Sequence, residues 1–399
     1  MADMRVIVVG TGVAGASCAY ALARQGVEVV TVESGRPGQA TAAGAGILQP
    51  WSSAAVPGTP WYELYLAGAA YYPTLIDRLT RDGVQDIGYA RTGSLVVSAD
   101  RDQLDDVEAR VAAHGPERPE VGEVHRLDPV RARALFPPLA EHLSAVHITG
   151  GARVDGRRLR AGLLDGARRH GALARQGDAE LVVEGGAVTG VRVTGEHAGG
   201  ESGSDEPGSD AHVGGEHGSG ETIAADIVVA AAGAWTNAVL APLGLRVPVE
   251  PQRGQIVHLR LPGVDTGNWP TVLPMGPHYL VCFDDRVVVG ATRETGSGFD
   301  VQVTAAGLHE VLTAALSVAP GLSTASHLET RVGLRPLTPD QSPHVGFVPG
   351  VPGLAMLTGF GAAGLTMGPN AGEIVADLIR DRTPSLDVSA LAPTTTPVD

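Results

Sequence analysis

The sequence predicts an α/β fold in which a Rossmann-like domain is interleaved with an α+β domain built on a mixed, largely antiparallel sheet. Two observations predict it. Residues 4–33 have the pattern of a strand, a glycine-rich turn, a helix and a second strand. Buried strands that end in small-residue turns return near residues 226–235 and 354–364, whereas residues 246–325 mix strands with one helix. The Rossmann-like domain is therefore assembled from separated segments.

The 399 residues are enough for about two to three domains. We assign residues 1–48, 150–242 and 328–385 to the Rossmann-like domain, and residues 49–149 and 243–327 to the second domain. Residues 386–399 form a Pro/Thr-rich tail that we expect to be frayed.

Residues 196–221 consist of Gly, Ser, acidic residues and His, with almost nothing to bury, so they are predicted to be a disordered insertion. Three histidines in this stretch are irregularly spaced, and we predict no metal site from them.

The elements follow from apolar periodicity and from Gly and Pro at their ends. Predicted strands cover residues 4–9, 27–32, 93–98, 181–184, 188–193, 226–232, 255–260, 279–283, 287–290 and 354–357, and predicted helices cover 14–25, 104–113, 129–135, 158–170, 305–318 and 370–382. Six aromatic residues gather between residues 51 and 72, although aromatics are only 4% of the chain. Packing of a helix is the favoured interpretation of this cluster, and a substrate lid is the alternative.

The composition is globular, with 43% apolar and 18% charged residues. Two cysteines cannot build a disulfide framework, which fits a reducing compartment. All 29 basic residues are arginine. The absence of lysine excludes a Schiff base, a P-loop lysine and a pyridoxal phosphate anchor.

A formal net charge of −15 argues against nucleic acid or an anionic membrane as a partner. No apolar run reaches the roughly 18 residues that span a bilayer, and the first strand starts too early for a signal peptide. We expect a cytoplasmic protein whose partners are small molecules, and a homo-oligomer is left open.

The first glycine-rich turn carries the strongest motif. Gly10 allows the tight turn, Gly12 lets backbone amides approach a diphosphate, and Gly15 lets the helix pack on the strand. Glu33 ends the next strand, where a carboxylate can accept both ribose hydroxyls and disfavours a 2′-phosphate. The sequence therefore predicts a dinucleotide site that does not take NADP.

Three further runs of small residues, at 39–46, 231–235 and 359–364, allow the backbone to approach a large planar ligand closely. A nicotinamide dehydrogenase of simple topology does not need three such places along the whole chain. A flavin threaded between two domains does.

Nine segments in the same order resemble the D-amino-acid oxidase superfamily of flavoproteins, in its branch of glycine oxidases, sarcosine oxidases and D-amino-acid dehydrogenases. They are residues 8–15, 33–35, 41–47, 233–236, 253–255, 289–292 and 333–336, and residues 359–365 with 371–377 complete the set. The resemblance implies FAD. Covalent branches use a cysteine near the late strands, and Cys282 does not match that motif, so we expect non-covalent FAD.

The resemblance and the glycine pattern together give the expected cofactor-binding residues. These are Gly10, Gly12, Val13, Ala14, Gly15, Glu33, Ser34, Thr41, Ala42, Ala43, Gly46, Ile47, Val182, Ala232, Gly233, Trp235, Gly333, Arg335, Gly361, Gly364, Leu365 and Thr366.

For the substrate, the resemblance implies that Arg335 binds a carboxylate over the flavin, since a guanidinium grips a carboxylate with two hydrogen bonds. Tyr279 matches a tyrosine whose hydroxyl orients the same carboxylate; an ordinary strand tyrosine is the alternative. Some relatives carry a basic residue in the late turn where this chain has Ala362 and Ala363, and sarcosine oxidases use a lysine beside the flavin that is missing here. Arg293 is a further candidate for a pocket cation.

The implied activity is oxidative deamination of glycine or a D-amino-acid-like substrate. Hydride passes from Cα to flavin N5, the imine hydrolyses to a 2-oxo acid, and O2 is the expected acceptor. The alternatives are an N-methyl amino-acid oxidase, a 2-hydroxy-acid dehydrogenase, and a non-catalytic flavoprotein subunit.

Overall fold

A computed structural model describes residues 4–54, 58–114, 118–195 and 220–398. The first sheet has six strands in the order β20-β21-β12-β1-β2-β8. All neighbours in it are parallel except β20 and β21. The strands are β1 (Arg5–Val9), β2 (Glu28–Glu33), β8 (Leu173–Gln176), β12 (Ile227–Ala230), β20 (His344–Phe347) and β21 (Leu354–Thr358).

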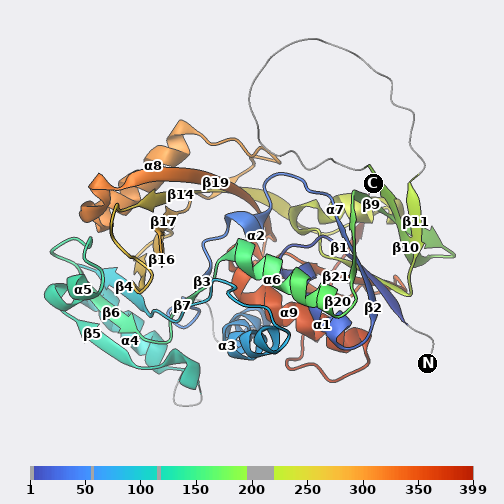
Figure 1. Cartoon of the computed structure of the whole chain (residues 1–399), viewed down its shortest axis with the longest axis horizontal. Helices are drawn as coiled ribbons and strands as arrows, with labels where there is room; N and C mark the ends of the chain where they lie inside the picture. Colours follow the sequence, from blue (N-terminus) through green and yellow to red (C-terminus); the bar gives the residue numbers. More distant parts are fainter. Residues whose placement is uncertain (1–3, 55–57, 115–117, 196–219, 399) are drawn as a thin grey trace, which may run out of the picture.

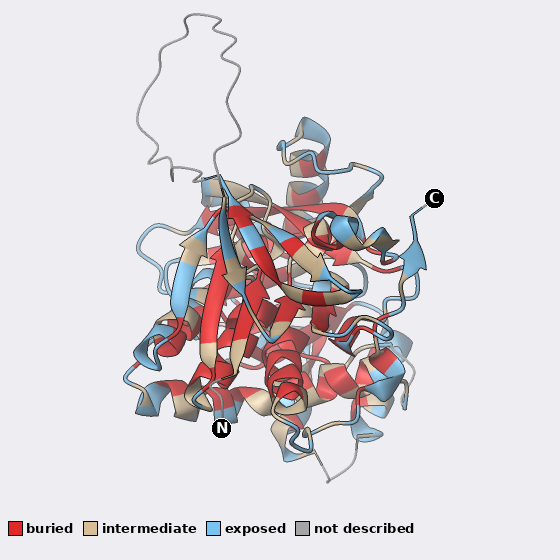
Figure 2. Ribbon diagram, turned by 90° about the vertical axis from the view of Figure 1, so that its right-hand side faces the viewer, coloured by how far each residue is buried: buried red, intermediate tan, exposed pale blue. Residues whose placement is uncertain are grey.

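Four helices cover one face of this sheet (Figure 1). They are α1 (Val13–Arg24), α3 (Pro60–Arg81), α6 (Gly156–Arg169) and α9 (Gly364–Ile379). Helix α1 is buried along almost its whole length because it lies between the sheet, α6 and α9. The residues of α1, α9 and the sheet form the largest apolar core, and Figure 2 shows these buried residues running through the middle of the molecule.

The aromatic cluster mainly packs α3, as the favoured interpretation predicted. Tyr62 and Tyr72 are 2% and 1% exposed, and Tyr72 stacks on Tyr89 with ring centroids 5.7 Å apart. Tyr65, at the same end of α3 as Tyr62, also reaches the wall of the larger cavity described below.

Helix α9 begins at Gly364, six residues before the predicted start at residue 370. The helix therefore contains Pro369, although proline has no N–H to donate inside a helix. The carbonyl oxygen of Leu365, which the amide of residue 369 would otherwise bond, accepts a hydrogen bond from the Tyr72 hydroxyl instead. A partner on α3 therefore lets the helix continue through the proline.

The opposite face of the first sheet carries an antiparallel three-stranded sheet of β9 (Asp178–Glu184), β10 (Ala187–Thr194) and β11 (Glu221–Ala224). Its apolar side chains pack on those of β1, β2, β12 and β21. Most of the predicted insertion, residues 196–219, lies outside the described residues.

The second sheet is mixed and mostly antiparallel, in the order β18-β14-β17-β16-β15-β4-β6-β5, with β19 also paired to β14. The only parallel neighbours in it are β4 and β15. The strands are β4 (Ser94–Ser98), β5 (Val124–Leu127), β6 (Ser144–Ile148), β14 (Glu250–Arg260), β15 (Thr271–Pro274), β16 (Tyr279–Phe283), β17 (Arg286–Gly290), β18 (Glu294–Thr295) and β19 (Ser326–Leu337).

Helices α4 (Arg101–Ala112), α5 (Pro129–Leu135) and α8 (Ala305–Val318) lie on this second sheet. Helix α2 (Ala40–Ala43) and the pair β3 (Ile47–Leu48) and β7 (Ala152–Arg153) connect the two sheets. The long strands β14 and β19 run from the second sheet toward the first (Figure 1). The expected fold class, an α/β protein with a mixed second sheet, is confirmed; the domain boundaries stay a prediction.

The C-terminal tail is not frayed, contrary to our expectation, over the residues that the structure describes. Val388 and Leu391 are 4% and 3% exposed in the largest core. Strand β22 (Thr396–Pro397) pairs with β13 (Leu245–Arg246). Two apolar anchors and this pairing order a segment whose Pro/Thr content favoured an extended chain.

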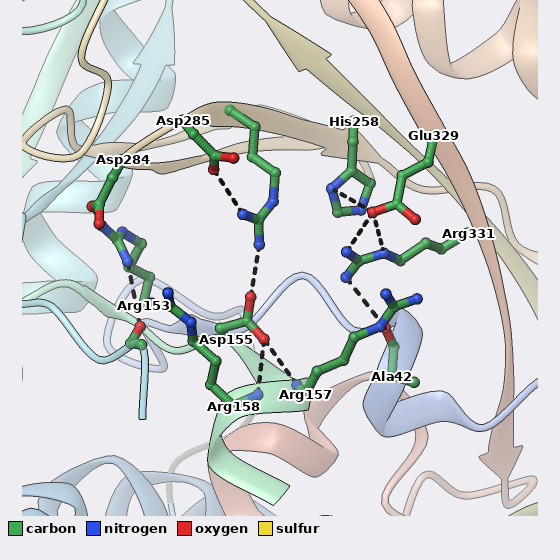
Figure 3. Close-up of polar contacts among 12 residues, drawn as sticks. Ala42, Arg153, Asp155, Arg157, Arg158, His258, Asp284, Asp285, Glu329 and Arg331 are labelled. Atoms are coloured by element: carbon green, nitrogen blue, oxygen red, sulfur yellow. Dashed lines mark hydrogen bonds and ion pairs between the residues drawn. The ribbon is translucent and has the colours of Figure 1, made fainter. Parts of the chain in front are cut away.

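A cluster of charged side chains joins α6 to the second sheet (Figure 3). Asp155 caps α6 by accepting from the amides of Arg157 and Arg158, and its other oxygen accepts from Arg286 at 2.7 Å. Arg157 and Arg331 both donate to the carbonyl oxygen of Ala42, at 3.1 and 3.4 Å. The cluster therefore fixes α2, which lies beside the cavities.

Candidate active site

Two adjoining cavities of about 370 and 150 Å³ lie between the carboxyl ends of the first sheet and the second sheet. Ligands of open α/β sheets bind at this edge. Both cavities are lined by Gly12, Ala40, Thr41, Ala231, Gly233 and Pro336. The two cavities together form one cleft. The residues that they share, which include the N-cap residue of α1, Gly12, form the boundary between them, here named the waist.

Two glycines beside the waist, Gly10 and Gly15, cannot be replaced without a clash. Gly10 has φ +92°, and a Cβ on Gly15 would lie 2.0 Å from the carbonyl oxygen of Gly10. The N-cap residue of α1 is Gly12, which has no side chain to cap the helix, and the first turn of α1 contains no acidic residue. A helix N-terminus of this kind attracts a diphosphate. The Thr41 hydroxyl accepts from the amide of Val13 at 2.9 Å and so closes the waist from the other side.

Glu33 lines the smaller cavity at the end of β2. Its carboxylate accepts from the amide and hydroxyl of Thr11, the amide of Gly35, Gln39 and Arg160. Burial raises the pKa of this carboxyl. The hydrogen bonds from Thr11 and Gly35 and the charge of Arg160 lower the pKa by more than burial raises it, so the net pKa is below the ordinary value. An ionised carboxylate that is held this way can accept hydrogen bonds from ribose hydroxyls.

Most of the predicted cofactor-binding residues line the cleft. The smaller cavity is lined by Gly10, Gly12, Glu33, Ser34, Thr41, Ala232, Gly233 and Trp235. The larger cavity is lined by Gly12, Val13, Ala14, Thr41, Ala43, Gly46, Ile47, Gly233, Gly333, Arg335, Gly361, Gly364, Leu365 and Thr366.

Three predicted cofactor-binding residues lie elsewhere. Gly15 packs α1 against the turn and has no surface on either cavity. Ala42 turns its carbonyl oxygen away to Arg157 and Arg331. Val182 pairs with Gly190 in the middle of β9, and the strand instead reaches the smaller cavity with Ala179, near its start.

The guanidinium of Arg335 lies in the wall of the larger cavity. One of its nitrogens, Nη1, donates to the carbonyl oxygen of Thr292 at 3.0 Å and to Gln252 at 3.3 Å. Gly254 makes room for it, because a Cβ there would lie 2.4 Å from Nη2. Burial lowers the pKa of this guanidinium and the charge of Arg293 lowers it further, while Tyr279 opposes both. Arginine remains charged under such conditions.

Tyr279 stands beside Arg335 in the same wall. It pairs with Gly290 of β17, where a Cβ would lie 2.9 Å from its hydroxyl oxygen. Burial raises the pKa of Tyr279 although Arg335 and Arg293 lower it, so the phenol stays protonated and can donate. The two residues proposed for the substrate are therefore neighbours, each facing a glycine of the adjacent strand.

The described lining of the larger cavity contains two guanidiniums and no carboxylate. The guanidiniums belong to Arg335 and Arg293. The nearby Glu294 is already bound by Arg253, Gln255 and the Thr292 hydroxyl, at 2.6–2.9 Å. The field in this cavity therefore favours an anion, and its described lining has no carboxylate to pair with an ammonium group.

Several residues of the cleft were not found from the sequence. Thr11 and Arg160 hold Glu33, and Gly254 frames Arg335. Phe360 and Tyr65 supply the aromatic part of the larger cavity. Thr11, Gly254 and Phe360 stand inside segments that carry the family resemblance and could have been named with them. Arg160 and Tyr65 reach the cleft only through the fold.

Neither cysteine reaches the cleft. Cys282 is fully buried in the core of the second sheet, and burial raises the pKa of its thiol. It cannot attach a flavin, which favours non-covalent binding. Among the described residues no group of His, Cys, Asp and Glu has the geometry of a metal site, and no helix combines the length and hydropathy to cross a bilayer.

Comparison with known families decides the identity of the cleft. The model of the DAO family, described as FAD dependent oxidoreductase, matches residues 5–378. The chain belongs to this family. FAD is thus its cofactor, and the glycines of the waist, the anion-attracting α1 terminus and Glu33 fit the diphosphate and ribose of that dinucleotide.

Curated relatives cover nearly the whole chain. An uncharacterized oxidoreductase (YurR) of Bacillus subtilis is 43% identical over 97% of this chain and 98% of its own length. Glycine oxidase of Pseudomonas aeruginosa is 31% identical over 98% of both chains. The protein is therefore an FAD-dependent oxidoreductase, of a family whose relatives include enzymes named for amino acids.

Two solved structures extend the comparison. Iminodiacetate oxidase from Chelativorans sp. is 44% identical with a TM-score of 0.89, covering 98% of this chain and 99% of that one. Glycine oxidase from Geobacillus kaustophilus is 28% identical with a TM-score of 0.79 over 98% and 99%. The expected resemblance to glycine oxidases is confirmed.

Proposed function

We propose that this enzyme oxidises the C–N bond of a small amine that carries a carboxylate on the same carbon. The observation that carries the proposal is the guanidinium of Arg335 in a cavity wall whose described residues include no acid. A carboxylate is the natural partner of such a guanidinium, and an arginine fork fixes its plane. Glycine or a D-amino-acid-like substrate meets these demands.

The chain contributes orientation. Arg335 and the Tyr279 hydroxyl bind the two carboxylate oxygens, which leaves Cα and the amine facing the part of the cavity lined by Gly44, Gly46 and Ile47. Because no carboxylate in the described wall would hold an ammonium, the amine binds as the neutral base, the form from which hydride leaves. FAD held by the residues of the cleft would supply the two-electron acceptor for this hydride.

The products follow from the balance of the reaction. Loss of hydride from Cα and of a proton from nitrogen leaves an imine, to which water adds. The hydrolysis releases a 2-oxo acid and ammonia, and O2 takes up two electrons and two protons to form hydrogen peroxide. No side-chain base is needed for this sequence.

An N-substituted glycine is the second candidate substrate. Ala362 lines the larger cavity where some relatives carry a long basic side chain, so that end is roomier. The 44% identical relative is named for iminodiacetate, a secondary amine. The same oxidation would then release glyoxylate and a primary amine instead of ammonia.

An anaerobic screen tests the function. Amines are added to the yellow holoenzyme, bleaching of the flavin absorbance is recorded, and air is readmitted while ammonia, primary amine and hydrogen peroxide are measured. Arg335→Ala should raise KM strongly and leave FAD bound, with Arg335→Lys intermediate. Unchanged kinetics in Arg335→Ala, or a flavin that no amine reduces, would overturn the proposal.

A further inference from the structure

Arg293 is a cation in the wall of the larger cavity that has no ion-pair partner within the part of the chain that the structure describes. It lies three residues after the end of β17, is exposed, and lines the larger cavity. With the described residues it makes no hydrogen bond and no ion pair. The adjacent acid in the sequence, Glu294, is bound by Arg253, and Arg253 also binds Asp300; both contacts are 2.6 Å long.

Arg293 is also close to the proposed carboxylate clamp. Arg335 donates to the carbonyl oxygen of Thr292, the residue directly before it. The charges of both arginines act on the Tyr279 hydroxyl, and that of Arg293 also acts on Arg335. The helix end that attracts the diphosphate lies at the waist, among residues that line both cavities, whereas Arg293 lines the larger cavity only.

A substrate with one carboxylate would pair with only one of the two guanidiniums in the wall of the larger cavity. Its carboxylate would sit on Arg335 and Tyr279, and the second guanidinium would face the cavity without an anion. Two guanidiniums with no opposing acid in the described wall match a dianion far better than a monoanion.

We propose that the physiological substrate carries two carboxylates, and that Arg293 is the specificity-determining residue that binds the second one. This inference rests on the proposed function, because it assigns the first carboxylate to Arg335. Two chemical arrangements present such a pair: a secondary amine with a carboxymethyl group on each side of nitrogen, and a primary amine with an acidic side chain.

The oxidation is unchanged by the second carboxylate. For the secondary amine, Cα loses hydride and nitrogen loses a proton, and water cleaves the imine to glyoxylate and glycine. For the primary amine, the same steps give a 2-oxo dicarboxylate and ammonia. In both, O2 receives the two electrons and becomes hydrogen peroxide.

Three variants test the assignment: Arg293→Met, which keeps the stem and removes the charge; Arg293→Lys, which keeps the charge; and Arg101→Met as the matched control. Arg101 is an exposed arginine at the start of α4, outside the lining of both cavities. The substrates are iminodiacetate, D- and L-aspartate, D- and L-glutamate, and the monocarboxylates sarcosine and glycine.

We expect the wild-type enzyme to prefer a dicarboxylate. Arg293→Met should raise KM for that substrate about tenfold, change kcat little, and leave KM for the monocarboxylates within about threefold. Arg293→Lys should recover most of the loss and Arg101→Met should equal the wild type. Added salt should weaken dicarboxylate binding in the wild type more than in Arg293→Met, because an exposed charge is screened.

Binding measured without turnover separates this inference from the function itself. Oxydiacetate has the shape of iminodiacetate and no nitrogen, and methoxyacetate is its monocarboxylate counterpart; both are titrated against the flavin spectrum. Preference for oxydiacetate that disappears in Arg293→Met supports the inference even if no amine is oxidised. Equal binding of the two acids, an equal loss for mono- and dicarboxylates in Arg293→Met, or a defect confined to reoxidation by O2 would overturn it.

Discussion

Gly254→Ala should damage catalysis without touching the substrate, the flavin or the stability of the fold. The Cβ that it adds would lie 2.4 Å from Nη2 of Arg335, 2.5 Å from Nη1 and 2.6 Å from Cζ. An ordinary contact needs at least 3.4 Å, so the guanidinium must move by about 3.4 − 2.4 = 1.0 Å. Because Gly254 does not have a positive φ, its backbone accepts alanine, and the atoms displaced are the end of a flexible side chain.

A shift of about 1 Å in a substrate-positioning group can cost on the order of a hundredfold in rate. We therefore expect kcat/KM to fall about a hundredfold, equivalent to about 2.7 kcal/mol, with the loss mainly in KM. Steady-state kinetics give this ratio, and the flavin-to-protein absorbance ratio and Tm are measured on the same samples. Both should stay near the wild-type values.

A double-mutant cycle sharpens this prediction. If Gly254→Ala acts through the guanidinium, it should have almost no further effect in an Arg335→Met background, since the group that it displaces is already gone. A kcat/KM within threefold of the wild type would refute the reasoning. So would additive losses in the double mutant, which would mean that the new methyl group acts on something other than Arg335.

Three further outcomes follow from the structure. Gly15→Ala should yield colourless apoprotein with a lowered Tm, because its Cβ would lie 2.0 Å from a backbone oxygen that cannot move aside; a yellow protein of normal Tm would contradict the tight packing of the waist. Arg160→Met removes one of the donors to the Glu33 carboxylate, the charged one, and should raise the Kd for FAD about tenfold in reconstitution titrations, with kcat unchanged at saturating FAD. Burial lowers the pKa of His258 to about 4, below its unfolded value of about 6.5, so the unfolded state binds the proton first and stability is lost as pH falls from about 6.5 to about 4. His258→Gln should remove up to about 3 kcal/mol of that pH dependence in denaturant titrations, and an unchanged slope would count against it.

The fold could be predicted where its signals are local. The N-terminal strand, turn and helix lie within 30 residues, and each boundary carries a glycine or a change of period, so β1, α1 and β2 were found within one or two residues of their ends. The start of α9 was wrong because the hydroxyl that tolerates Pro369 comes from Tyr72, about 300 residues earlier. The order in the tail comes likewise from a distant core.

The candidate site divides in the same way. Residues inside glycine-rich motifs were named from the sequence, and most of them line the cleft. Their supports were not, because Arg160 reaches Glu33 across 127 residues and Gly254 meets Arg335 across about 80. A motif records which residues face a ligand, whereas the residues that hold them in place need only fit the local geometry.

The pairing of β14 with β19 explains why Gly254 and Arg335 lie next to each other. In the register of these strands Gln252 lies opposite Arg335, and Gly254 lies opposite Gly333. Residues 252 and 254 point to the same face of a strand. The side chain of Arg335 therefore lies over Gly254 and donates a hydrogen bond to the side chain of Gln252. A larger residue at 254 would push the guanidinium out of the wall. A smaller residue at 252 would remove the hydrogen bond from Nη1 to Gln252 and keep only the one to the Thr292 carbonyl oxygen. The position of the charge in the cavity is therefore set by two residues of the facing strand, the side chain of Gln252 and the missing side chain of Gly254, and this constraint appears in the sequence only once the register is known.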